Sequence, residues 1–176
     1  MEYSIFYLIE GETGKYQNQL VKDLSQNFGG NSILKSDLPT GIALKVPFEV
    51  ENIGAIEKVI GDFVKKEKPA KIAAHEFGKV KKFTAVINFK LSKQAFRLQK
   101  KLLEELGEVK IKAHKYDRKF KAYSVIVYSK TKRQFRKLLK HLSEMKKPKF
   151  KLKINNIAIM KKVGKVWKLH KKFRIK

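Results

Sequence analysis

The sequence predicts an α+β protein with two pseudo-symmetric lobes, in which antiparallel sheets face a central cleft and helices lie outside. Apolar residues recur with a period of about 2 in some segments, as in strands, and of about 3.6 in others, as in helices. The order strand, helix, strand, strand occurs twice, with Pro69 and Pro148 at matching places. No segment has the composition of a linker, so we expect a single two-lobed domain over residues 1–176.

The first elements are predicted to be a strand, a turn and a helix. Residues 2–10 alternate as a strand does, and G-E-T-G at 11–14 has the composition of a turn. Apolar residues four positions apart predict a helix over 16–27, which should end at Gly29 and Gly30.

The segment D-L-P-T-G-I-A-L-K-V-P-F at 37–48 predicts an unusual strand. Its alternation places the strand at 41–46, with one ordinary apolar face. The other face carries Gly41, Ala43 and Lys45, and its first two residues have almost no side chain to pack. Because glycine and alanine weaken strands, these two positions call for an explanation.

The middle of the chain predicts a helix, a pair of strands and a second helix. Residues 52–66 have amphipathic helical spacing, and 71–80 and 83–90 alternate as strands joined by a turn at V-K-K. Ser92 is a suitable cap for a following helix, which Gly107 should end.

The next segments repeat part of this order. Residues 110–119 are polar and irregular, and 123–128 form an apolar strand pattern. Thr131 and Gln134 have the spacing of a capping box at the start of a helix over 131–146.

The net charge of +26 is the strongest functional signal, and it is unevenly distributed. Residues 1–60 carry five basic and eight acidic residues, whereas 61–176 carry 37 basic and eight acidic residues. A net charge of roughly 2–8 suffices for the solubility of a small domain, so the excess predicts a polyanionic partner, first of all nucleic acid. A Lys-rich proteome is an alternative explanation. An acidic membrane surface is a third, disfavoured because the chain has no single amphipathic anchor.

Several classes of site and location are not expected. The chain has no cysteine, which excludes disulfides and thiolate metal ligands, and its four histidines lack metal-ligand spacing. We therefore expect neither a metal nor a cofactor. No apolar run approaches the roughly 20 residues that span a bilayer, and the first residues do not resemble a signal peptide, so a cytoplasmic protein is expected.

Three segments carry a family resemblance. They are G-I-A-L-K-V-P-F at 41–48, K-A-Y-S-V-I-V at 121–127, and a basic hairpin predicted from 150–160 and 166–175, which contains I-N-N-I-A-I-M and turns at V-G-K. Together they resemble the two-histidine phosphoesterase superfamily, the fold of the RNA 2′,3′-cyclic phosphodiesterases also called 2′-5′ RNA ligases. The resemblance covers nearly the whole chain. It implies a motif H-x-[T/S]-hydrophobic in each lobe, on strands that line the cleft.

The resemblance implies that both motifs are degenerate. Gly41 stands where the first histidine is expected and Ala43 where the first threonine is expected. In the second motif Tyr123 and Val125 occupy these places, although a slip of one residue would instead give Ala122 and Ser124. The family reaction needs one imidazole to accept a proton and another to donate one, so the resemblance implies that this reaction is lost and that no residue is catalytic.

The charge and the resemblance together predict an RNA-binding protein. Lysine neutralises phosphate as a point charge and arginine reads bases, so a chain with only five Arg should bind mainly the RNA backbone. The residues expected to bind RNA are Lys45, Lys119, Lys121, Tyr123, Lys130, Lys132, Arg133, Arg136, Lys137 and Lys140. The cleft and the outer basic surface of helix 131–146 with the terminal hairpin remain open as the site, with the outer surface slightly favoured.

Two other functions remain open. One is an RNA 2′,3′-cyclic phosphodiesterase or 2′-5′ RNA ligase with unorthodox catalytic residues, for which His75 or His114 would have to reach the cleft. The other is a structural subunit of a ribonucleoprotein.

Overall fold

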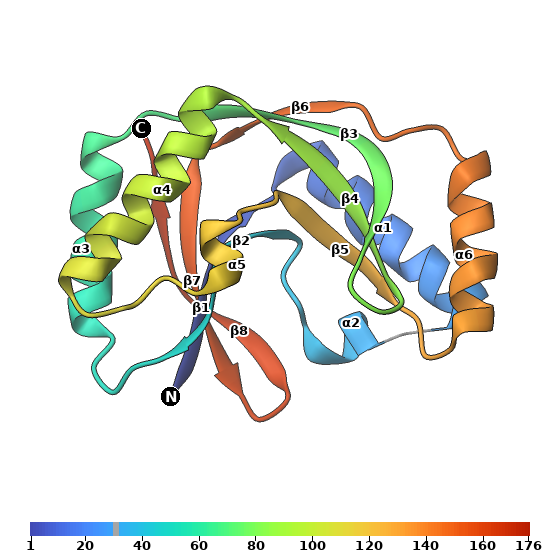
Figure 1. Ribbon diagram of the computed structural model, residues 1–176, viewed down its shortest axis with the longest axis horizontal. Helices are drawn as coiled ribbons and strands as arrows, with labels where there is room; N and C mark the ends of the chain where they lie inside the picture. Colours follow the sequence, from blue (N-terminus) through green and yellow to red (C-terminus); the bar gives the residue numbers. More distant parts are fainter. Residues whose placement is uncertain (30–31) are drawn as a thin grey trace.

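The computed structural model describes residues 1–29 and 32–176. Within these residues the chain forms eight strands and six helices (Figure 1). In chain order they are β1 (Glu2–Leu8), α1 (Gly11–Phe28), α2 (Ser32–Ser36), β2 (Gly41–Glu49), α3 (Gly54–Lys66), β3 (Ala70–Val80), β4 (Thr84–Leu91), α4 (Lys93–Glu108), α5 (Lys115–Arg118), β5 (Tyr123–Tyr128), α6 (Lys132–Glu144), β6 (Phe150–Ile154), β7 (Asn156–Val163) and β8 (Val166–Arg174).

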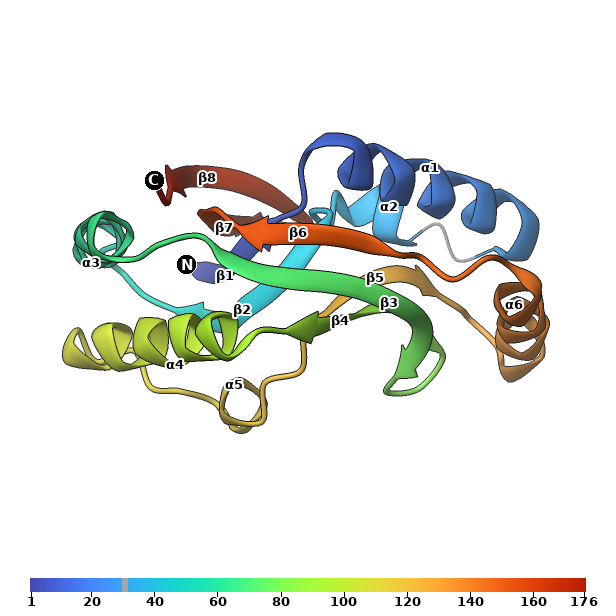
Figure 2. The ribbon, with the colours of Figure 1, turned by 90° about the horizontal axis from the view of Figure 1, so that it is seen from above.

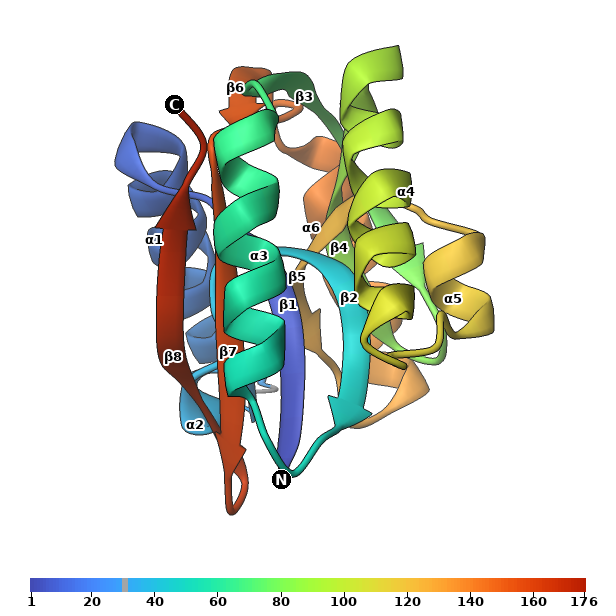
Figure 3. The same ribbon diagram turned by 90° about the vertical axis from the view of Figure 1, so that its left-hand side faces the viewer.

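The strands form two four-stranded antiparallel sheets. The first has the order β2-β1-β7-β8, and Figure 3 shows its strands side by side behind α3. The second has the order β5-β4-β3-β6. Strands β2 and β5 occupy edges of the two sheets and contact each other, so the lobes meet along these two strands. The predicted α+β class with two antiparallel sheets is confirmed.

One apolar core joins the two lobes. It includes Ile5 and Ile42 of the first sheet and Ile87 and Ile126 of the second, all at most 1% exposed. Helices cover the ends of the molecule, with α3 and α4 at one end and α1 and α6 at the other (Figures 1 and 2). Although α1 follows β1 in sequence, it packs on β5 and α6 and thereby ties the first lobe to the second.

The predicted helix caps at Ser92 and Thr131 are present, but the predicted capping box is wrong in its second half, because the buried Oε1 of Gln134 has no hydrogen-bond partner among the described residues. The Ser92 hydroxyl accepts a hydrogen bond from the Ala95 N–H at 3.1 Å, and the Thr131 hydroxyl accepts one from the Gln134 N–H at 3.2 Å. Each satisfies a backbone donor that the first turn of a helix leaves free.

The predicted turn at 11–14 is wrong, because α1 already begins at Gly11. Gly11 has a φ of 69°, which glycine adopts without strain, and Gly14 lies so close to the Ile9 carbonyl that a Cβ would overlap it. Both glycines are therefore required by the backbone geometry at the start of α1. At its other end Gly29 is the C-cap as predicted, while Gly30 lies outside the described residues.

The predicted strand over 150–160 is also wrong, because it is two strands in different sheets. β6 pairs with β3, whereas β7 pairs with β1 and β8. The change of sheet follows from Asn156, whose buried amide donates to the Leu8 carbonyl and accepts from the Leu8 N–H, both at 3.0 Å. The hairpin that turns at V-G-K is present as β7–β8, with Gly164 at a φ of 62°.

Two short helices were not predicted. α2 and α5 are too short for apolar periodicity to show them, and α5 lies in the segment 110–119 that was expected to be irregular. No helix in the described part of the chain is long and apolar enough to cross a membrane.

Candidate functional site

A pocket of about 440 Å³ lies where the two sheets meet, and we call it the junction pocket. Ala43 and Val46 of β2 and Tyr123 of β5 line it. The other lining residues come from the end of β3 with the turn after it, and from α5 with the segment that leads to β5: Lys79, Val80, Lys81, Tyr116, Asp117, Lys119, Phe120 and Lys121. The fold thus brings one residue from each sequence motif, Ala43 and Tyr123, into a single cavity.

The junction pocket is basic. The lysines that line it are Lys79, Lys81, Lys119 and Lys121, and all four are exposed and have no ion pair among the described residues. The two lysines from the segment before β5 were predicted. Sequence reasoning missed Lys79 at the end of β3 and Lys81 in the turn that follows, because only the fold brings this part of the chain beside Tyr116 and residues 119–121.

Two tyrosines give the pocket an aromatic lining. Tyr116 is 50% exposed, and the Lys81 ammonium lies 4.8 Å from the centre of its ring. Tyr123 is half-buried, and this burial, with a smaller contribution from Tyr116, raises the pKa of its hydroxyl. At neutral pH Tyr123 is therefore a hydrogen-bond donor and not a base.

Lys45 does not lie in the pocket, and its predicted place on the face of Gly41 and Ala43 is wrong. In the pairing of β1 with β2, Ala43 is opposite Phe6 and Lys45 is opposite Ile5, so Leu44 is an extra residue on β2. This bulge turns the strand over, so that Lys45 points into the core and Val46 faces the pocket, and a second irregularity follows before Phe48. Lys45 is 2% exposed and its ammonium is not available to RNA phosphate.

Asp117 of α5 neutralises this buried lysine. Its Oδ2 lies 2.9 Å from the Lys45 Nζ and also accepts a hydrogen bond from the His114 N–H at 2.7 Å. Its Oδ1 accepts one from the Val46 N–H at 2.8 Å. The buried Gln99 amide donates to the carbonyls of Leu44 and Asp117. These bonds hold α5 against β2, and they occupy the one carboxylate that borders the pocket.

None of the four histidines, all of which lie in the described residues, lines the junction pocket. His114 caps α5, accepting a hydrogen bond from the Tyr116 N–H at 3.4 Å, and His75 lies 3.2 Å from the Glu76 carboxylate. His141 packs on the Phe28 ring, and His170 lies 2.7 Å from the Glu57 carboxylate. The pocket therefore has cations and aromatic rings but no imidazole lining.

Gly41 has no room for a side chain. A Cβ at this position would overlap the Tyr7 carbonyl oxygen on β1 and come within 3.3 Å of the Phe6 ring. Because the obstacle is backbone, any larger residue must displace β1. The glycine at position 41 is thus a packing requirement of this chain, set by the close approach of β1.

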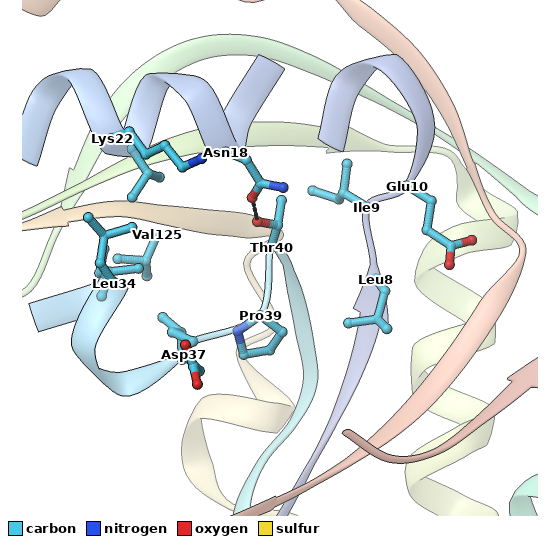
Figure 4. Close-up of a pocket in the computed structure, with 13 residues that line it drawn as sticks. Leu8, Ile9, Glu10, Asn18, Lys22, Leu34, Asp37, Pro39, Thr40 and Val125 are labelled. Atoms are coloured by element: carbon cyan, nitrogen blue, oxygen red, sulfur yellow. Dashed lines mark hydrogen bonds between the residues drawn. The ribbon is translucent and has the colours of Figure 1, made fainter. Parts of the chain in front are cut away.

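A second pocket, of about 470 Å³, contains the remaining motif position, Val125 (Figure 4). Val125 faces this pocket and Tyr123 faces the junction pocket, whereas Ser124 is buried and accepts a hydrogen bond from Gln17 at 2.5 Å. In the second pocket the Thr40 hydroxyl bonds to Asn18. Its charged residues are of both signs, and its other residues are mostly apolar, which does not favour a polyanion.

The other predicted RNA-binding residues lie apart from the junction pocket. The exposed basic residues of α6 and the loop before it are Lys130, Lys132, Arg133, Arg136, Lys137 and Lys140. They lie at the end of the molecule formed by α6, on the right in Figure 1. The structure therefore separates the predicted residues into the buried Lys45, a pocket group and a helix group.

The two antiparallel sheets meet along β2 and β5, with the junction pocket beside this contact, and solved structures share this arrangement. Solved structures with this fold cover nearly the whole chain. TT0787 of Thermus thermophilus has a TM-score of 0.66 at 11% identity, over 99% of this chain and 98% of that one. E. coli LigT in its complex with 3′-AMP has a TM-score of 0.61 over 99% of this chain, and LigT in its apo form has a TM-score of 0.58 over 98% of this chain. Both are 8% identical to this chain, and in both the match covers 96% of LigT.

At these identities the likeness establishes the fold. No protein-family model matches the sequence, and a comparison with curated proteins finds no significant match. The predicted similarity to the 2′-5′ RNA ligase fold is confirmed.

Proposed function

We propose that this chain, as a single two-lobed domain, binds RNA and lacks the acid–base chemistry that the two-histidine motif implies. The junction pocket is the observation that carries the proposal. It combines four lysines without ion pairs, the rings of Tyr116 and Tyr123, and no imidazole. Such a lining suits phosphate and a stacked base or ribose, and it lacks the imidazoles that the family reaction needs as general acid and base.

The proposed contacts follow from the chemistry of each side chain. The lysine ammonium groups neutralise phosphates, and the exposed Tyr116 ring offers a face on which a base can stack. The protonated Tyr123 hydroxyl donates a hydrogen bond to a phosphate or ribose oxygen. The complex of LigT with 3′-AMP supports the proposal, because it shows that a protein of this fold holds a nucleotide.

The phosphodiesterase or ligase alternative is less well supported. It requires a general acid and a general base near the bound phosphate. His75 and His114 were the candidates, and neither lines the junction pocket. Clear hydrolysis of a 2′,3′-cyclic phosphate by the purified protein, lost in His75→Ala or His114→Ala, would contradict the proposal.

Binding of a fluorescent single-stranded RNA at several salt concentrations tests the proposal. The logarithm of the affinity should fall with the logarithm of salt concentration by about 0.7 for each phosphate neutralised, and several units are expected in total. Lys119→Glu combined with Lys121→Glu should weaken binding. Arg133→Glu combined with Lys137→Glu introduces the same charge change on α6 and should weaken it less.

Three outcomes separate the hypotheses. Loss of binding only in the pocket variant supports the junction pocket, whereas loss only in the α6 variant moves the site to the outer helix. A flat salt dependence, or no binding by the unmodified protein, refutes RNA binding through phosphates. RNA that copurifies with a fixed set of proteins would identify the ribonucleoprotein subunit instead.

A further inference from the structure

A second basic surface lies on the exposed side of the second sheet, outside the junction pocket. A shallow groove of about 740 Å³ crosses β6, β3 and the end of β4, and four exposed lysines surround it: Lys71, Lys90, Lys151 and Lys153. We call these four residues the lysine face. Seen from above, β6 and β3 cross the near side of the molecule and no helix lies in front of them (Figure 2).

The strand register sets the arrangement of the lysine face. Lys90 and Lys151 both pair with Ala73 of β3, from opposite sides, and Lys71 pairs directly with Lys153. Directly opposite residues of antiparallel strands point to the same side of the sheet, as do residues two apart along one strand. The four ammonium groups therefore project together from two adjacent rows, with the small Ala73 between two of them as the floor of the groove.

This arrangement is unfavourable in the isolated protein. Directly opposite residues have Cβ atoms about 4.5–5.5 Å apart, and like charges at this distance repel each other. No acidic residue lines the groove, and no ion pair is formed by any of the four lysines among the described residues. By contrast, on β8 Lys171 and Lys172 pair with Glu57 and Glu10. The lysine face is a place where a bound polyanion would relieve repulsion.

The groove continues onto the start of α4, where an aromatic ring is exposed. A second cavity shares Leu91 and Ser92 with the first and is otherwise lined by Lys93, Phe96 and Arg97. Phe96 is 48% exposed although it is a large apolar residue. Two further cations thus flank a ring whose face is open to a ligand.

We infer that the lysine face and the start of α4 form a track for single-stranded RNA, separate from the junction pocket. The lysines hold successive phosphates, and one unstacked base lies on the Phe96 ring. A single strand is required because the bases of a duplex are stacked on each other and not free to lie on a side chain. The inference rests on the proposed RNA binding and adds a second site to it.

The direct pairing of Lys71 with Lys153 supplies a variant that separates binding from folding. Lys153→Glu places a carboxylate opposite Lys71, and an opposite-charge pair across two strands stabilises a sheet. The melting temperature should therefore stay equal or rise, while the affinity for a fluorescent single-stranded RNA falls. The salt dependence of binding should become shallower by at least about 0.7 in the log–log slope, because at least one phosphate is no longer neutralised.

Phe96→Ala tests the stacking on α4. The affinity should fall about 5- to 150-fold, the range measured for the loss of one base stacked on an aromatic side chain. Leu169→Ala is the matched control, because Leu169 is 52% exposed on β8 and also loses an exposed apolar side chain. Lys58→Glu on α3 is the control for charge, and at about 0.1 M salt its long-range effect should be largely screened.

The results distinguish the proposed RNA track from the proposed RNA binding in the junction pocket. If Lys153→Glu and Phe96→Ala bind RNA as the unmodified protein does, while Lys119→Glu with Lys121→Glu does not, the track is refuted and RNA binding in the pocket stands. If the unmodified protein binds no RNA, both claims fail. If Lys153→Glu loses binding to anionic phospholipid vesicles but keeps its RNA affinity, the face is a membrane surface and the track is refuted.

Discussion

The junction pocket and the lysine face are two basic regions built in different ways. The pocket gathers its lysines from the end of β3 with the turn after it and from the segment before β5, and the buried Lys45–Asp117 pair holds one wall of the pocket in place. The lysine face has no such support, and the register of three strands alone sets its geometry. The pocket is therefore suited to an end or a single nucleotide of RNA, and the face to a length of backbone.

The difference shows that the net charge alone does not identify a binding surface. The β7–β8 hairpin is rich in lysine, yet several of its cations pair with Glu2, Glu10 and Glu57 of the acidic N-terminal part of the chain. The lysine face and α6 have no such partners among the described residues. Lysines without carboxylate partners, and not lysine-rich segments as such, are the better candidates for RNA.

Removing Asp117 should have the largest effect, and it should disrupt only the pocket. Asp117→Ala leaves the buried Lys45 ammonium without its carboxylate partner and two backbone N–H groups without an acceptor. We expect a loss of about 3–5 kcal/mol in the free energy of unfolding, measured by chemical denaturation. The double variant Lys45→Met with Asp117→Leu should lose less, because no charge stays buried. A loss below about 1 kcal/mol in Asp117→Ala would mean that the pair does not support the pocket wall.

Gly41→Ala should have the next largest effect. The new Cβ overlaps the Tyr7 carbonyl, so β1 and β2 must separate at a place where they are paired. Overpacking of this kind costs about 1–3 kcal/mol in the free energy of unfolding. Gly107→Ala is the control, for which we expect an increase in the free energy of unfolding and not a decrease. Gly107 is helical with open space around it, so alanine should stabilise α4 by about 0.5–1 kcal/mol. Equal stability of the two variants would refute the packing explanation for Gly41.

Substitution of Tyr123 distinguishes the contribution of its ring from that of its hydroxyl. If the ring stacks on a base, Tyr123→Ala should weaken the binding of a short single-stranded RNA by about 1–3 kcal/mol. Tyr123→Phe keeps the ring and should retain most of the affinity, losing only the hydrogen bond of the hydroxyl, about 0.5–1.5 kcal/mol. Fluorescence anisotropy at fixed salt measures both. Unchanged affinity in Tyr123→Ala, together with lower affinity in Lys153→Glu, would leave the lysine face as the main site.

The smallest effect is expected from the paired cations of β8. Hydrogen bonds from Lys171 and His170 hold the pKa of Glu57 below its ordinary value of 4.5. A carboxyl with a lowered pKa in the folded state stabilises the fold above its unfolded-state pKa, and this contribution is lost as the pH falls through the folded-state value. Because solvent screens the pair, the loss should be under about 1 kcal/mol. Glu57→Gln should remove this acid sensitivity, seen as a smaller stability difference between pH 7 and about pH 3. An unchanged difference would show that the pairing is weak.

The sequence by itself determined most of the elements, the fold class and the excess of positive charge. Caps at Ser92 and Thr131, apolar periodicity and glycine turns are local signals, because each depends on residues within one or two turns of the chain. The charge asymmetry is likewise a property of composition, and it does not depend on how the chain folds.

Only the tertiary structure decided which lysines are exposed and lack a carboxylate partner. A bulge at Leu44 turned Lys45 into the core, and the pairing of β3 with β4 and β6 brought Lys71 and Lys90 beside Lys151 and Lys153. Alternation along a strand shows which residues share a face, but it does not show where a bulge interrupts that face or which strands lie beside it. Whether a lysine meets a carboxylate depends on segments more than a hundred residues away, as the pairing of Lys171 with Glu57 shows.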